Sequence, residues 1–208
     1  MKIVPVSHTC ALTFTMQYLK IKEETSLFEW FQSNQLQYIT DVINKIKIKI
    51  DDNIILNTNR KNMICMNTAG IFSGHYTVES YKKIFIRRAN RFLYKIKNSE
   101  ELLFVRLNSH DGTPTSLVEL KNFYKSILSI NPSLKIKFLL IDVVTLEKDF
   151  REIKDEYLTH KFILNIDIGG DRYLKNNKKV SELILKYVNE IGYKTYIVNK
   201  EFGDYSTN

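Results

Sequence analysis

Cysteine, proline and glycine are scarce in this sequence. Its 208 residues contain 2 Cys, 3 Pro and 7 Gly. The two cysteines, Cys10 and Cys65, cannot form the disulfide framework of a small secreted domain. We therefore expect free thiols in a reducing compartment. We also expect no long flexible linker, because such linkers are rich in glycine or proline.

Long hydrophobic runs are also missing. No segment approaches the roughly 20 apolar residues of a transmembrane helix, so we expect no membrane partner. The start of the chain lacks the apolar stretch of a signal peptide, because Ser7, His8 and Thr9 follow the first six residues at once. Both absences favour a soluble, cytoplasmic protein.

Acidic residues are fewer than basic ones. There are 23 Asp and Glu against 31 Lys and Arg, which gives a formal net charge of +8. Such an excess can serve nucleic-acid binding, but the lysines are scattered among acidic residues and form no block. We therefore interpret the charge as solvated helix faces and expect no nucleic-acid partner. A nucleic-acid binder would instead lose affinity steeply as salt rises.

The rest of the composition is typical of a globular domain. Hydrophobic residues make up 44% of the chain and charged residues 26%, which are ordinary values. A chain of this length can bury a core without metals or disulfides, and we predict one domain over residues 1–208. The 12 Tyr and 12 Phe can supply a core or a dimer surface. The sequence therefore does not decide between a monomer and a homo-oligomer.

Hydrophobic periodicity divides the chain into alternating strands and helices. Helices are predicted at residues 10–19, 36–46, 78–96, 117–130, 146–157 and 181–191. Strands are predicted at 2–6, 54–56, 63–66, 102–107, 136–142, 162–168 and 196–198. Strands joined by helices form right-handed crossovers and parallel sheets. We therefore predict a three-layer, mostly parallel α/β fold, Rossmann-like or flavodoxin-like.

Cys10 is the strongest candidate for chemistry, because it lies at a predicted strand-to-helix turn. Parallel α/β folds place their sites beyond the carboxyl ends of strands. A thiol in the first turn of a helix is stabilised as thiolate by the helix dipole, and the free N–H groups there can hold an oxyanion. The alternative is a small buried residue. Cys65 lies in an apolar run and is predicted to be a core residue.

A nucleophilic cysteine needs a base, which is most often histidine. His75, in the loop before the predicted helix at 78–96, is the first candidate. His8 lies two residues from Cys10, and His110 follows a predicted strand. For each of them the alternative is an exposed loop histidine.

Arg88 is the most informative charged residue. On a helical wheel it falls inside the apolar arc of its predicted helix, whereas Arg87 and Arg91 point away. A buried guanidinium needs a partner. That partner is either a ligand anion or a protein carboxylate, for which the candidates are Asp142, Asp167 and Glu29.

Cofactor motifs are absent from the sequence. It has no Walker-type phosphate loop and no GxGxxG after a strand. The spacing of Cys and His does not match a zinc site. We therefore expect no cofactor and no metal.

Several motifs resemble, in the same order, those of a known family. Members of the papain-like cysteine peptidase family of unknown function, found in bacteria and large DNA viruses, open with a strand, a turn and a cysteine that begins a helix. The matching residues are Pro5-Val6-Ser7-His8-Thr9-Cys10-Ala11, Ser26-Leu27-Phe28-Glu29-Trp30, His75, Tyr81, Arg87-Arg88, Arg91-Phe92 and Phe104-Val105-Arg106. The resemblance extends to about Asp142, with Leu27 replacing a proline and Glu29 an aspartate.

The resemblance implies a catalytic pair of Cys10 and His75, oriented by an acid such as Glu29 or Asp167. We accordingly predict a cysteine-dependent hydrolase, or an acyl or glycosyl transferase, acting on a small-molecule, glycan or peptide substrate. The residues predicted to contact the substrate are His8, Trp30, Arg87, Arg88 and Arg106. The alternative is a non-covalent binder of a nucleotide, sugar phosphate or glycan, in which the three arginines supply the charge.

Overall fold

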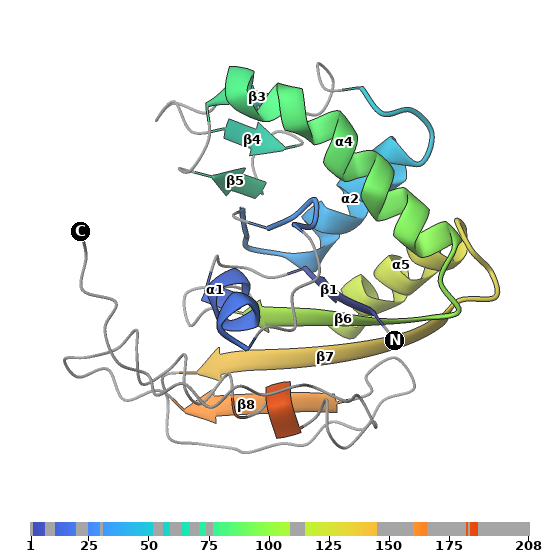
Figure 1. The fold of residues 1–208 in the computed structure, drawn as a ribbon. Coiled ribbons are helices and arrows are strands. Elements are labelled where there is room, and N and C mark those ends of the chain that lie inside the picture. The colour runs from blue at the N-terminus through green and yellow to red at the C-terminus, as the bar shows by residue number, and fades with distance from the viewer. Residues whose placement is uncertain are drawn as a thin grey trace.

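The structure is a computed structural model that describes residues 2–6, 11–19, 25–29, 31–51, 56–58, 64–66, 71–73, 77–108, 115–144, 160–165, 182 and 184–186 (Figure 1). The helix predicted at 146–157 and the strand predicted at 196–198 lie outside these residues. Of the helix predicted at 181–191, residues 182 and 184–186 are described, and they are helical.

A parallel sheet forms one side of the described fold. Its strands are β1 (Lys2–Pro5), β6 (Glu101–Asn108), β7 (Lys135–Val144) and β8 (His160–Asn165), in the order β1-β6-β7-β8. Each neighbouring pair is parallel, and Figure 1 shows the arrowheads of β6, β7 and β8 on the same side. The predicted α/β class with a parallel sheet is confirmed.

Both faces of strand β6 are covered by protein. Every residue from Leu102 to Asn108 is buried, and successive side chains of a strand point to opposite faces. A strand buried on both faces is expected to read as a continuous apolar run. One charged residue, Arg106, interrupts that run.

The main helices are α1 (Ala11–Tyr18), α2 (Leu36–Ile46), α4 (Val78–Lys97) and α5 (Leu117–Leu128). Both α4 and α5 begin with a capping box, formed by Thr77 with Ser80 and by Ser116 with Glu119. In each box the first side chain accepts the N–H of the other residue, whose own side chain accepts the N–H of the first. These boxes fix where α4 and α5 begin.

The main core lies between one face of the parallel sheet and helices α2, α4 and α5. Phe123 of α5 packs edge-to-face on Phe104 of β6 and on Phe138 of β7, with ring centroids 5.0 and 5.5 Å apart. Helix α2 packs against α5. Other core residues of the helices are Leu36, Ile39, Val42, Ile43, Ile46, Tyr81, Phe85, Phe92, Leu120 and Ile127.

A second sheet, antiparallel and not predicted as a sheet from the sequence, contacts α2 through its strand β2 and lies above the parallel sheet in the view of Figure 1. Its strands are β2 (Gln32–Ser33), β5 (Ile71–Ser73), β4 (Ile64–Met66) and β3 (Leu56–Thr58), in the order β2-β5-β4-β3. Strands of two or three residues are too short to show alternation, which explains why β2 and β5 were missed. Helix α4 contacts β3.

None of the helices in the described parts of the chain is long and apolar enough to cross a bilayer.

Candidate functional site

In the sequence, the candidate nucleophile Cys10 lies between strand β1 and helix α1. β1 ends at Pro5, and the N–H of Val6 donates to the carbonyl of Val105 in β6 at 2.9 Å. Helix α1 begins at Ala11, the residue after Cys10 in the sequence. The β1–α1 connection, residues 7–10, therefore starts at the carboxyl edge, the edge at which the parallel strands end.

Five predicted site residues lie outside the described residues. These are His8, Cys10, Trp30, His75 and Asp167. The pairing of Cys10 with His75 therefore stays a prediction. Glu29, Arg87, Arg88 and Arg106 are described, and the structure separates them into different environments.

Glu29 is a buried carboxylate in a short segment, residues 25–29, that precedes β2. Its side chain is 2% exposed, and its Oε1 accepts the backbone N–H of Ser26 at 2.6 Å. A carboxylate with so little solvent requires hydrogen-bond donors around it. Glu29 therefore closes the 25–29 segment into a turn.

Helix α4 holds the 25–29 segment in place. The Tyr81 hydroxyl donates to the Leu27 carbonyl at 2.8 Å, and Arg91 Nη2 donates to the Thr25 carbonyl at 3.2 Å. Phe28 packs edge-to-face on Phe92, with centroids 5.4 Å apart. Arg91 was predicted to point away from the apolar arc, but it is half-buried because it reaches this backbone carbonyl.

Arg87 and Arg88 occupy opposite environments on α4. Arg88 is 7% exposed, and its guanidinium lies 5.5 Å from the centroid of the Tyr81 ring, which is a cation–π arrangement. Arg87 is exposed. The predicted burial of Arg88 within the apolar face is confirmed. The two arginines do not face a common surface.

Arg106 joins three distant parts of the chain at the carboxyl edge. Its side chain is 0% exposed. Nη1 donates to the Val6 carbonyl at 3.0 Å, Nη2 to the Ser33 carbonyl at 3.0 Å, and Nε to Thr115 Oγ1 at 3.1 Å. Asn108 Nδ2 also donates to Thr115 Oγ1, at 3.0 Å. Arg106 thereby connects the end of β1, the end of β2 and the chain just before α5.

One signal for this role is present in the sequence, although it does not identify the partners. Arg106 shares a face of β6 with Leu102 and Phe104, because strand side chains alternate, and that face meets the main core. An arginine inside such a run must find internal acceptors. Its partners Val6 and Ser33 are 100 and 73 residues away in the chain, a separation that no periodicity reveals.

Glu119 joins the starts of α2 and α5 near the same edge. Its Oε2 accepts the Ser116 N–H at 2.8 Å, and its Oε1 accepts the Gln37 N–H of α2 at 3.2 Å. The free N–H groups in the first turn of α2 therefore gain an acceptor from another helix. One carboxylate fixes two helix starts relative to each other.

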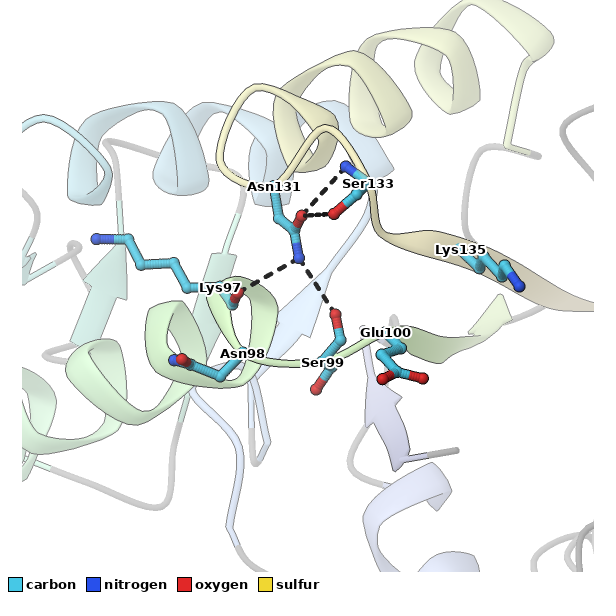
Figure 2. A pocket seen from close by; sticks show the side chains of 7 residues that line it. All are labelled: Lys97, Asn98, Ser99, Glu100, Asn131, Ser133 and Lys135. Carbon is cyan, nitrogen blue, oxygen red and sulfur yellow. Dashed lines mark hydrogen bonds between the residues drawn. The ribbon is translucent and has the colours of Figure 1, made fainter.

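A hollow of about 440 Å³ lies at the opposite, amino edge of the sheet (Figure 2). The side chain of Asn131, one of the residues that line it, joins two segments of the chain by hydrogen bonds. Its Nδ2 donates to the carbonyls of Ile96, Lys97 and Ser99 at 2.9, 3.4 and 3.2 Å, and its Oδ1 accepts from the N–H and hydroxyl of Ser133. The hollow thus surrounds a structural contact between the end of α4 and the turn before β7.

A second hollow, of about 240 Å³, lies between α2 and α5. Two side-chain hydrogen bonds join residues that line it. Ser126 donates to Asn44 at 2.8 Å, and Lys47 donates to Ser129 at 3.0 Å. These two hydrogen bonds join α2 to the end of α5 across the hollow.

Within the ranges that the structure describes, no group of three or more His, Cys, Asp or Glu residues converges in a way that could hold a metal ion. Comparisons of the chain with protein-family models, with curated proteins and with solved structures found no match.

Proposed function

We propose that this protein is a cysteine-dependent hydrolase or transferase in which Cys10 is the nucleophile. The observation that carries the proposal is the order of elements at the carboxyl edge: β1 ends beside β6, and α1 begins at the residue after Cys10. Parallel α/β proteins place reactive groups at such strand-to-helix connections. The positive end of the α1 dipole favours a thiolate over a thiol there.

The proposed reaction is nucleophilic substitution at an electrophilic carbon. The Cys10 thiolate forms a bond to the carbon, and the leaving group departs with a proton supplied by His75. Backbone N–H groups near Ala11 stabilise the oxyanion if the carbon is a carbonyl. Water or an acceptor molecule, deprotonated by His75, then displaces Cys10. Glu29 or Asp167 orients the imidazole.

The substrate class follows the resemblance to papain-like cysteine peptidases. We propose a small-molecule, glycan or peptide substrate, contacted by His8 and Trp30, and no cofactor. The arginines support an anion-binding function less well. Arg88 lies against Tyr81 and Arg106 is fully buried, so of the three arginines only Arg87 is exposed.

The fold proposed around this site is a single three-layer domain of residues 1–208, Rossmann-like or flavodoxin-like, working in the cytoplasm. Burial of both faces of β6 supports the layers. Leu12 and Met16 of α1 and Ile184 are buried apolar residues outside the main core, which is consistent with a second covered face.

The test is the rate of Cys10 alkylation by iodoacetamide as a function of pH. The Cys65→Ala variant leaves Cys10 as the single thiol, because the chain has two cysteines. We expect half-maximal reactivity below pH of about 7.5, compared with about 8.5 for an ordinary thiol. His75→Ala in the same background should move the midpoint toward the ordinary value.

Circular dichroism provides the control for folding. Cys10→Ala is expected to keep the melting profile of the parent protein, because a nucleophile at the carboxyl edge is not a packing residue. If Cys10 reacts only after unfolding, or if Cys10→Ala prevents folding, Cys10 is a core residue and the proposal is wrong.

A further inference from the structure

We infer that Arg106 is a positioning residue that fixes the backbone on which the candidate active site is built. This inference rests on the proposed function. It replaces the substrate-binding role predicted from the sequence, because a side chain that is 0% exposed has no surface to offer to a substrate. The described hydrogen bonds of its guanidinium go to two backbone carbonyls and one hydroxyl of the protein itself.

The three acceptors lie next to the segments that carry the predicted site residues. Val6 is the residue before the β1–α1 connection, and its carbonyl accepts from Nη1. Ser33, whose carbonyl accepts from Nη2, follows Glu29 and Trp30 by only a few residues. Thr115 is the first described residue after Asn108, the last residue of β6. One planar group therefore sets the relative positions of three described residues, each of which flanks a segment of the sequence that carries candidate site residues.

The chemistry of the guanidinium suits this role. Its N–H groups diverge in one plane, so bonds to three separate segments fix both distance and direction. Burial strengthens each bond because water does not compete. A lysine would keep the positive charge but present it as a point, and it could not hold the three acceptors in the same arrangement.

Asn131 provides a matched comparison at the other end of the sheet. It also makes several hydrogen bonds to backbone carbonyls and joins two segments, but it does so at the amino edge (Figure 2). Loss of the Asn131 hydrogen bonds should lower the free energy of unfolding without changing the structure at the carboxyl edge. Loss of the Arg106 contacts should affect the β1–α1 connection directly.

The experiment compares three variants in the full-length Cys65→Ala chain. Thr115→Val removes the hydroxyl that accepts from Arg106 and Asn108 while keeping the side-chain shape. Arg106→Lys keeps the charge, and Asn131→Ala is the control. Two quantities are measured at a temperature at which circular dichroism shows every variant folded. They are amide hydrogen exchange in the peptide from Val6 to Leu12 and the pH dependence of Cys10 alkylation.

We expect Thr115→Val and Arg106→Lys to raise exchange in that peptide by about tenfold or more, because the connection opens more often. We expect alkylation at neutral pH to slow about fivefold or more, as the Cys10 pKa returns toward about 8.5. Asn131→Ala should leave both quantities at the parent values, even if it lowers the melting temperature as much as Thr115→Val or Arg106→Lys does. If Arg106→Lys does not fold, the two measurements on Thr115→Val alone test the inference.

Two results would overturn the inference. One is unchanged exchange and alkylation in Thr115→Val. The other is an equal change in Asn131→Ala, which would make Arg106 a contributor to stability alone. Failure of the proposed function looks different, because Cys10 of the parent chain would then alkylate like an ordinary thiol. The exchange comparison would still decide whether Arg106 fixes the connection.

Discussion

At the scale of single residues, the Tyr81 hydroxyl is a buried donor with one identified acceptor, the carbonyl of Leu27. Tyr81→Phe should lower the free energy of unfolding by about 1–2 kcal/mol, because the carbonyl loses its partner in a buried site. Tyr94→Phe is the matched control, since Tyr94 lies on the same helix and is 68% exposed. Urea denaturation of both variants measures the difference. Equal effects would mean that the contact to the 25–29 segment contributes nothing specific.

The arginines illustrate what sequence can and cannot predict about single residues. The helical wheel placed Arg88 on the buried face and Arg87 on the exposed one, and both placements are confirmed. Periodicity reports only which way a side chain points relative to its own element. It could not report that Arg106 reaches Val6 and Ser33, because those contacts depend on how distant elements come together.

At the scale of elements, the capping box of α5 offers a direct test of how that helix is fixed. Ser116 Oγ accepts the Glu119 N–H at 3.2 Å. Ser116→Ala should lower the free energy of unfolding by about 1 kcal/mol, because one N–H of the first turn loses its acceptor. Ser116→Thr keeps the hydroxyl and should lose much less. Thermal unfolding distinguishes the two, and equal losses would show that the cap is unimportant.

Long elements were predicted closely, and so were the short strands β1 and β4, whereas β2 and β5 were missed. Helix α2 has the predicted bounds, and α4 extends one residue past its predicted end. Helix α5 ends two residues earlier than predicted, at Leu128. The antiparallel sheet was not predicted as a sheet, since its two- and three-residue strands depend on their neighbours rather than on their own pattern. Of the candidate site, the sequence named Glu29 only as a possible partner of Arg88 or as an acid that orients His75. It did not predict that Tyr81 and Arg91 hold the 25–29 segment, because those contacts join distant parts of the chain.

At the scale of the whole molecule, the order of strands predicts the order of folding. β1 pairs with β6 alone among the described strands, and Lys2 aligns with Leu102 across 100 residues of chain. Closing so long a loop is slow. We therefore expect β1 to join the sheet after the transition state for folding.

Two valine substitutions test this order. Val4→Ala in β1 and Val42→Ala in α2 both remove buried methyl groups and should each cost about 1–3 kcal/mol. For Val4→Ala the loss should appear almost entirely as faster unfolding, whereas for Val42→Ala part of it should appear as slower folding. Stopped-flow fluorescence of the single tryptophan, Trp30, measures both rates. A slower folding rate for Val4→Ala would mean that β1 docks early.

The distance between β1 and β6 along the chain also has a consequence for synthesis in the cell. At roughly 5–20 residues per second, the ribosome needs about 5–20 s to add the residues that separate the two strands. During that interval Ile3, Val4 and Val6, all buried in the finished fold, have no sheet to join. The nascent chain thus carries an unpaired apolar strand that chaperones can bind. The hydrogen bond from Arg106 to the Val6 carbonyl can form only when this interval ends, so the contact that connects the end of β1 to β6 is among the later ones that the nascent chain makes.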